Sequence, residues 1–293
     1  MKSEQWTIKS VLDWTQTYFK EKFVESPRLS AEILLADTLG LERIDLYVQF
    51  DRPLDKQELS DFKSKLLRRA RHEPVAYITQ TKAFWKSTFA VSSHVLIPRP
   101  ETELLLETAI SYIQSQNKSM RTIELGVGSG AVIISLASEL PSHLYLGTDY
   151  SFPAIQIAQQ NARQILEVNK GIQFVVSDWF GSISTAQPFN LIISNPPYIP
   201  THTLSTLQPE ISRFEPQMAL DGGQNGLIHI HAIIQQAAKH ISADGLLLLE
   251  IGFDQREAVE KFVAESDVFK AVKIIKDYAG YDRIACISNG VCS

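Results

Sequence analysis

Hydrophobic residues recur at helical spacing through the first 75 residues of the chain. After a first predicted helix, a second one runs from Leu29 to Leu39, and Gly40 can terminate it. Asp55, followed by Glu58 three positions later, resembles the capping box at the start of a further helix. These patterns predict a small helical bundle over residues 1–75. The apolar face of the first predicted helix carries Ile8, Val11, Leu12, Thr15, Tyr18 and Phe19.

The pattern changes after residue 75. Between Ala76 and Ile97, β-branched and aromatic residues partly alternate with polar ones, which predicts a β-hairpin. Pro98 and Pro100 end this segment before a new helix that begins near Glu101. Residues 76–100 are therefore expected to link two domains.

Residues 101–293 show apolar runs that alternate with helical patterns such as 152–166 and 227–241. Alternation of this kind predicts an α/β domain in which helices cover both faces of a parallel, Rossmann-like sheet. Ligands of such sheets bind beyond the carboxyl ends of the strands, where the strand order reverses. The expected strands are Thr122–Leu125, Leu144–Thr148, Ile172–Val176, Leu191–Ser194, Leu246–Ile251, Val272–Lys276 and Ile284–Ser288.

Charge and cysteine content narrow the function classes. The formal net charge of −5 provides no overall attraction for nucleic acid, which argues against DNA as the main substrate. The two cysteines, Cys286 and Cys292, form neither a disulfide framework nor a zinc pattern, so no metal is expected. Residues 1–22 lack the apolar core of a signal peptide, and no apolar stretch is long enough to span a bilayer. We therefore expect a cytoplasmic protein without a membrane partner.

A glycine-rich segment leaves the first predicted strand and enters a helix. Its glycines permit a tight turn and a close approach of a ligand to the backbone. Glycine spacing alone also fits a dinucleotide-binding loop, but Glu124 matches the methyltransferase form, in which an acid faces the methionine moiety. The candidate cofactor-binding residues here are Glu124, Gly126, Val127, Gly128, Ser129 and Gly130.

Acidic residues follow the next two predicted strands. Asp149 can accept hydrogen bonds from both hydroxyl groups of the ribose in S-adenosylmethionine, or it can cap the helix that begins near Phe152. Asp178 and Trp179 can hold the adenine through a hydrogen bond and a stacking surface.

The segment Asn195-Pro196-Pro197-Tyr198 follows the apolar run 191–193 and decides between these interpretations. An amide or exocyclic amino nitrogen is a poor nucleophile because its lone pair is delocalised. The Asn195 side-chain oxygen and the Pro196 carbonyl are two acceptors that can orient the NH2 hydrogens, while the prolines stiffen the turn. Tyr198 offers a flat face for the planar group. The segment predicts a methyltransferase that acts on a planar NH2 group and uses Asn195 also as a cofactor contact.

These motifs resemble the HemK/PrmC family of protein-(glutamine-N5) methyltransferases over nearly the whole chain. The resemblance rests on Glu73–Ile78, Ile97–Glu103, Glu124–Gly130, Ser177–Phe180, Asn195–Ile199, Glu215–Gly223 and Gly226-Leu227. It implies a seven-stranded class I methyltransferase fold behind an N-terminal helical bundle, with S-adenosylmethionine as cofactor. It further implies that the chain methylates the glutamine of the Gly-Gly-Gln motif in class 1 peptide chain release factors, and that the helical bundle contacts the factor.

The chain departs from the family pattern at four positions. Glu124 and Val127 replace the more usual Asp and Thr or Cys, Gln80 stands where Gly is common, and Asn225 stands where Asp is common. None belongs to the Asn195–Tyr198 motif, so the departures concern local loop geometry.

Other function classes fit parts of the sequence. An adenine-N6 or cytosine-N4 nucleic-acid methyltransferase would use the same acceptor motif, but it needs base flipping and usually a basic recognition region. A non-catalytic protein on the same fold leaves the intact Asn195–Tyr198 motif without a role, and so does an NAD-dependent oxidoreductase. A basic stretch is either a solvated helix face or a docking surface, and it comprises Lys63, Lys65, Arg68, Arg69, Arg71 and His72.

Overall fold

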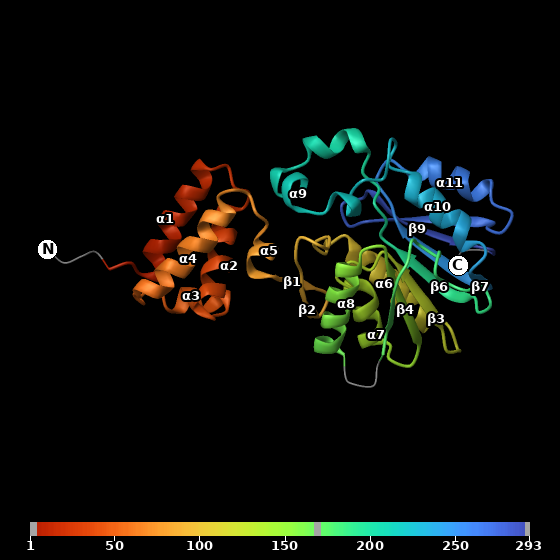
Figure 1. The fold of residues 1–293 in the computed structure, drawn as a ribbon, viewed down its shortest axis with the longest axis horizontal. Coiled ribbons are helices and arrows are strands. Elements are labelled where there is room, and N and C mark those ends of the chain that lie inside the picture. Colours follow the sequence, from red (N-terminus) through yellow and green to blue (C-terminus); the bar gives the residue numbers. More distant parts are fainter. Residues whose placement is uncertain (1–4, 167–170, 291–293) are drawn as a thin grey trace. The chain divides into compact units, whose positions relative to one another are not determined.

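The computed structural model describes residues 5–166 and 171–290 of the chain. It divides into two compact units (Figure 1). One comprises Met1–Thr81 together with Gln208–Phe214, and the other comprises Lys82–Leu207 and Glu215–Ser293. The short segment from the later part of the chain belongs to the first unit, although the sequence pattern placed it in the α/β domain.

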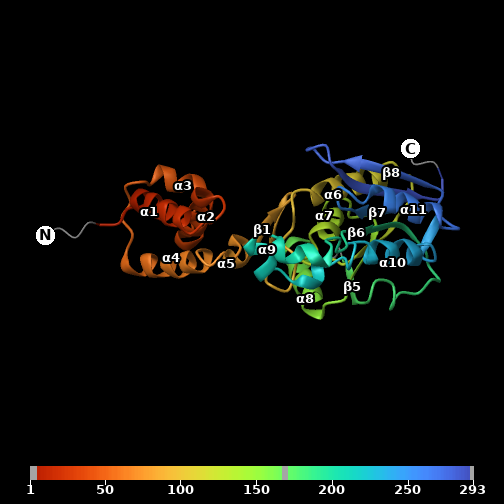
Figure 2. The ribbon, with the colours of Figure 1, turned by 90° about the horizontal axis from the view of Figure 1, so that it is seen from above.

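The first unit is a helical bundle (Figure 2). Thr7 caps its first helix through a capping box with Ser10, and Asp55 and Glu58 form the predicted capping box at the start of α4. The apolar face of α1 is buried in the core of this unit and packs mainly against α2, as its spacing predicted. The helices are α1 (Ile8–Glu21), α2 (Pro27–Leu39), α3 (Arg43–Val48), α4 (Lys56–Arg69), α5 (Val75–Thr79) and α9 (Pro209–Phe214).

The basic end of α4 is largely neutralised. Arg68 pairs with Glu73, and the buried Arg69 pairs with Glu210 of α9 at 2.7 Å. Because a buried guanidinium needs a partner, the Arg69–Glu210 pair accounts for the presence of Gln208–Phe214 in this unit. These contacts favour the structural interpretation of the basic stretch over a docking surface.

The second unit is built on a seven-stranded sheet with the order β5-β4-β3-β6-β7-β9-β8. Strands β3, β4, β5, β6 and β7 are parallel, and the strand order reverses between β3 and β6. The strands are β3 (Arg121–Leu125), β4 (Leu144–Asp149), β5 (Gln173–Val176), β6 (Phe189–Ser194), β7 (Ile241–Glu250), β8 (Ala271–Lys276) and β9 (Asp282–Ser288).

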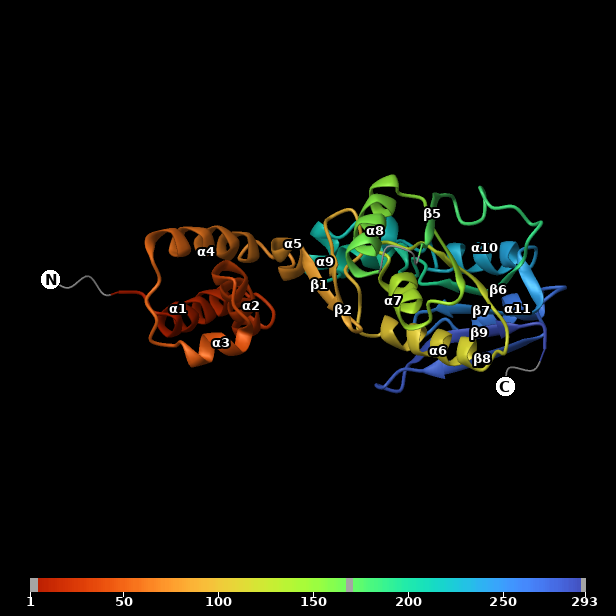
Figure 3. The same cartoon turned by 90° about the horizontal axis from the view of Figure 1, so that it is seen from below.

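Helices cover both faces of this sheet (Figure 3). On β7, Leu246 and Leu248 belong to the core under α6, α7 and α8, whereas Leu247 and Leu249 belong to the core under α10 and α11. Both faces are buried, so the strand reads as a continuous apolar run. The helices are α6 (Thr102–Gln114), α7 (Ala131–Glu139), α8 (Phe152–Ile165), α10 (Ile228–Ala237) and α11 (Arg256–Ala264), with the 3-10 turns η1 (Thr201–Thr206) and η2 (Gln217–Ala219).

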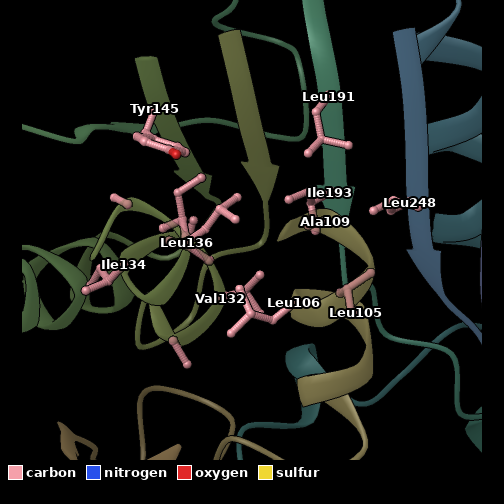
Figure 4. Packing of buried hydrophobic residues seen from close by; sticks show 14 of the residues in the cluster. Leu105, Leu106, Ala109, Val132, Ile134, Leu136, Tyr145, Leu191, Ile193 and Leu248 are labelled. Carbon is pink, nitrogen blue, oxygen red and sulfur yellow. The ribbon is translucent and has the colours of Figure 1, made fainter. Parts of the chain in front are cut away.

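Figure 4 shows the first of these cores at close range. Leu105 and Leu106 of α6 are completely buried in the cluster that also holds Ile193 of β6 and Val132 of α7. Burial of one such side chain stabilises the fold by about 1.5–3 kcal/mol. This packing holds the start of α6 and the end of β6 in fixed positions, and both carry residues of the site described below.

Strand β9 departs from the expected parallel sheet. It is antiparallel to both of its neighbours, β7 and β8. Only residues 277–281 join β8 to β9, and a parallel crossover needs a dozen residues or more. The short connection therefore enforces an antiparallel hairpin.

Residues 76–97, predicted as one β-hairpin, form part of a short helix and a shorter hairpin instead. Tyr77 and Ile78 lie in the short helix α5, and the hairpin is confined to β1 (Thr81–Phe84) and β2 (Ser87–Ala90). Both residues of the pair are buried, which a strand with one solvated face would not allow. Gln80 ends α5 with a φ of 60°, a left-handed conformation that explains why glycine is common at this position in the resembling family.

Within 5–166 and 171–290, no helix has both the length and the apolar character needed to cross a membrane. The same residues hold no cluster of histidine, cysteine and acidic side chains fit for a metal ion. Cys286 is buried in β9, and Cys292 lies outside the described residues.

Candidate active site

A cavity of about 490 Å³ opens beyond the carboxyl ends of β3, β4, β5 and β6, where the strand order reverses. Most of the residues that the sequence singled out line this cavity. They are Glu124, Gly126, Val127, Gly128, Ser129, Asp149, Asp178, Trp179, Asn195 and Pro197. Gly130, Pro196 and Tyr198 are not among its lining residues.

The glycine turn after β3 shapes one wall of the cavity. Gly128 has a φ of 53°, and a Cβ atom there would meet nothing within 4 Å, so the backbone is open to a ligand. Gly130 has another purpose. A Cβ atom there would lie 2.5 Å from Cδ1 of Ile134 and 3.2 Å from Cβ of Ala158, so its absence lets α7 pack close to α8.

Two carboxyl groups face this turn, that of the buried Glu124 and that of the half-buried Asp149. Glu124 accepts a hydrogen bond from the backbone N–H of Ile133 at 2.8 Å. Burial raises the pKa of Glu124 well above its ordinary value, and the neighbouring charge of Asp149 raises it further. Burial likewise raises the pKa of Asp149, while hydrogen bonds from the backbone N–H groups of Ser151 and Gly128 oppose that rise. The pair provides negative charge that a cationic ligand can stabilise.

Asp149 is not the cap of α8. The N-cap residue is Ser151, whose hydroxyl accepts a hydrogen bond from the backbone N–H of Ala154. The Asp149 carboxylate accepts from Gly128 at 2.9 Å and from Ser151 at 2.8 Å. Each oxygen keeps a further lone pair, which leaves both available to the cavity that Asp149 lines.

The wall after β5 is aromatic. Trp179 is half-buried, with a φ of 47°, and its ring lies 5.4 Å from that of His229. A Cβ atom at Gly126 would lie 3.7 Å from the Trp179 ring, so the indole closes over the glycine turn. Asp178, the preceding residue, is exposed at the cavity rim. A flat ring beside an acid at this point fits a purine base.

The Asn195–Tyr198 segment leaves β6 at the far side of the turn. The Nδ2 of Asn195 donates to Oγ1 of Thr102 at 3.1 Å, which turns the amide oxygen away from Thr102. Behind it, the Tyr198 hydroxyl donates to Oε1 of Glu250 at 3.2 Å. Burial first and the Glu250 charge second raise the pKa of Tyr198, so this hydroxyl keeps its proton.

Three residues around this segment were not singled out from the sequence. Thr102 accepts a hydrogen bond from Asn195, and Glu250 accepts one from the Tyr198 hydroxyl. Nε2 of Gln255 donates to the backbone oxygen of Tyr198 at 3.0 Å. Thr102 lies within Ile97–Glu103, which carried the family resemblance. Glu250 is the single acid that follows the apolar run 246–249, a pattern that Asp149 shares. Gln255 had no comparable signal.

Two other stretches of the family resemblance are joined in the structure. Glu215 is buried, pairs with Arg99 and accepts a hydrogen bond from the backbone N–H of Ile97 at 3.2 Å. Further along, a Cβ atom at Gly226 would lie 2.3 Å from the backbone oxygen of Tyr198. The loop that contains both residues is thus shaped around the Asn195–Tyr198 segment.

Comparison with known proteins decides the family. The model of the PrmC N-terminal domain matches residues 10–79, and the model of the methyltransferase small domain matches residues 100–211. The release factor glutamine methyltransferase of Geobacter sulfurreducens is 40% identical over 289 residues, with 97% of each chain covered. The enzyme of the same name from Leptospira interrogans is 36% identical and covers 96% of this chain and 98% of its own. The chain belongs to the release factor glutamine methyltransferase family.

Solved structures support the fold of this family member. A methyltransferase from Pyrococcus furiosus superimposes with a TM-score of 0.52 at 18% identity and covers 79% of this chain and all of its own. The hMettl16 catalytic domain, solved with an RNA hairpin, gives a TM-score of 0.53 at 14% identity and covers 81% of this chain and 83% of its own. At these identities the likeness concerns the fold alone, and it confirms the class I methyltransferase fold expected from the sequence.

Proposed function

We propose that the protein transfers a methyl group from S-adenosylmethionine to the side-chain amide nitrogen of the glutamine in the Gly-Gly-Gln motif of class 1 release factors. The observation that carries this proposal is the Asn195 amide at the cavity, with its NH2 group tied back to Thr102 and its oxygen free to accept. Membership of the family and full-length similarity to enzymes named for this activity support the substrate.

The cavity residues fit S-adenosylmethionine. The open turn at Gly128 leaves room beside the Glu124 and Asp149 carboxyl groups. Asp149 would accept the ribose hydroxyl groups, and Trp179 with Asp178 would hold the adenine. Glu124 would face the methionine end. When bound, the sulfonium supplies an electrophilic methyl group.

The chain's own task is to present the amide nitrogen. The Asn195 oxygen and the Pro196 carbonyl would accept the two NH2 hydrogens and so place the nitrogen lone pair toward the methyl group. The nitrogen becomes acidic only as its bond to the methyl carbon forms and the carbon–sulfur bond breaks. It then releases one proton to water, so no general base is required beforehand. Tyr198, fixed through its hydroxyl, would bound the site with its ring.

We further propose that the helical unit docks the release factor. Its surface carries an aromatic row in which Trp6 and Trp14 lie 6.2 Å apart and Trp14 stacks on Tyr18 at 5.1 Å. Trp14 is 50% exposed and Phe23 is 89% exposed. Exposed aromatic residues in a cluster are typical of protein-binding surfaces.

Labelled S-adenosylmethionine tests the function. The protein should transfer label to a class 1 release factor, but not to a factor whose Gly-Gly-Gln glutamine is replaced by alanine. DNA and RNA are the comparison arms, because a nucleic-acid methyltransferase would use the same acceptor residues. Label in nucleic acid and none in the release factor would overturn the proposal.

A further inference from the structure

A chain of buried hydrogen bonds joins three segments that are far apart in the sequence. Asn195 at the end of β6 donates to Thr102 at the start of α6, at 3.1 Å. The Thr102 hydroxyl donates to Oε2 of Glu250 at the end of β7, at 2.7 Å. The side chains of Thr102 and Glu250 are 5% and 1% exposed, so bulk water does not compete for these bonds.

While Glu250 is ionised, the hydrogen bonds that link Asn195, Thr102 and Glu250 can point in only one direction. A carboxylate accepts and cannot donate, so the hydroxyl groups of Thr102 and Tyr198 must both point their hydrogens at it. The lone pairs of Thr102 then face Asn195, which can satisfy them only with its NH2 group. The amide oxygen of Asn195 is left for the cavity, and the network rather than the rotamer decides which end of the amide faces a substrate.

Burial of an ionised carboxylate such as that of Glu250 costs desolvation free energy. Desolvation raises the pKa of Glu250, and the two hydroxyl donors and the charge of Arg283 oppose that rise. A glutamine would fill the same space without a buried charge. It would also present an NH2 group to one of the two hydroxyls, so the residue at position 250 would no longer enforce one direction of the hydrogen bonds.

We propose that Glu250, acting through Thr102, is a positioning residue that holds the Asn195 amide with its oxygen toward the substrate NH2 group. The same carboxylate holds the Tyr198 ring through its hydroxyl. This inference rests on the proposed function, because it assumes that Asn195 orients the glutamine amide. It assigns the orientation of Asn195 to a residue outside the Asn195–Tyr198 segment.

The first test is single-turnover methyl transfer to the release factor. Glu250→Gln should slow the transfer about 10- to 100-fold, less than the loss expected when a transition-state group is deleted outright. Affinity for S-adenosylmethionine should stay within about twofold, and the melting temperature should not fall because a buried charge has been removed. Thr102→Val, which replaces the hydroxyl with a methyl group, should slow the reaction to a similar extent. Thr102→Ser keeps the hydroxyl and should restore a rate close to that of the unmodified protein.

The second test separates positioning from general damage. In a double-mutant cycle, Glu250→Gln should have little further effect on an Asn195→Ala protein, because the group that it positions is gone. An equal effect of Glu250→Gln in both backgrounds would overturn the inference, as would unmodified rates in both Glu250→Gln and Thr102→Val. If Asn195→Ala itself reacts at the normal rate, the proposed function of Asn195 fails instead, so the two failures are distinguishable.

Discussion

Replacement of Asp149 by asparagine tests the cofactor site most directly. The carboxylate already accepts hydrogen bonds from Gly128 and Ser151, one on each oxygen, so each oxygen has a lone pair left for a ribose hydroxyl. Asparagine keeps one oxygen and turns the other into a donor. The change thus removes one hydrogen bond between the ribose and a charged group, at nearly constant volume.

The expected size follows from that count. A hydrogen bond to a charged group contributes about 1.5–3 kcal/mol, which corresponds to a loss of affinity of about 10- to 150-fold. One backbone N–H, that of Gly128 or Ser151, also loses its acceptor, so the free energy of unfolding should fall by about 1–3 kcal/mol. Alanine would remove both backbone acceptors and would mix the two effects more strongly.

Calorimetric titration with S-adenosylmethionine measures the first effect, and thermal unfolding measures the second. Asp244→Asn is the matched control, because Asp244 is an exposed aspartate that pairs with Lys118 and does not line the cavity. It should bind the cofactor as the unmodified protein does. Unchanged affinity in Asp149→Asn would refute the ribose contact and leave Asp149 as a support for the glycine turn alone.

Three further outcomes are expected. Asn195→Ala should lower the single-turnover rate about 10²- to 10³-fold with little change in cofactor affinity, and a normal rate would show that another group orients the amide. Burial raises the pKa of Glu124 well above its ordinary value, and a cationic ligand beside it favours the ionised form, so cofactor affinity should rise as the pH increases through that raised pKa. Glu124→Gln should flatten that rise, and an unchanged pH profile in this variant would exclude Glu124 as a cofactor contact. Trp14→Ala should raise the KM for release factor about 10- to 30-fold at constant kcat. The control is Leu144→Ala, which changes an exposed residue at the amino end of β4 and should leave the KM unchanged. A KM for Trp14→Ala equal to that of the unmodified protein would refute docking through the aromatic row.

Much of the α/β unit could be predicted from the order of apolar runs. Strands such as β3 and β6 were located correctly because each is a short apolar run that ends in a polar motif. The sequence alone could not give the direction of β9, because its apolar run fits either direction. The length of the connection from β8 excludes the parallel arrangement once those two strands are known to be neighbours.

The candidate site was predictable wherever one residue type has a local reason to stand where it does. Gly128 needs a left-handed backbone, and Asp149 is the acidic last residue of β4, so both can be found from their neighbours along the chain. Tyr77 and Ile78 show the limit of such reasoning. Their residue types suit a strand, but the local pattern does not show that both are buried, and in the structure they form a helical turn.

The sequence by itself determined which residue types stand at the strand ends of the candidate site: a glycine turn after β3, an acid at the end of β4, another after β5, and an amide with two prolines and a tyrosine after β6. These are local motifs, and parallel strands bring their carboxyl ends to one edge of the sheet. Only the tertiary structure decided how the motif is held. Thr102 and Glu250 are separated by 148 positions along the chain, and only the packing of α6 beside β6 and β7 brings their side chains within 2.7 Å. A hydrogen bond of that kind depends on distance and direction in space, which the spacing of residues along the chain does not contain.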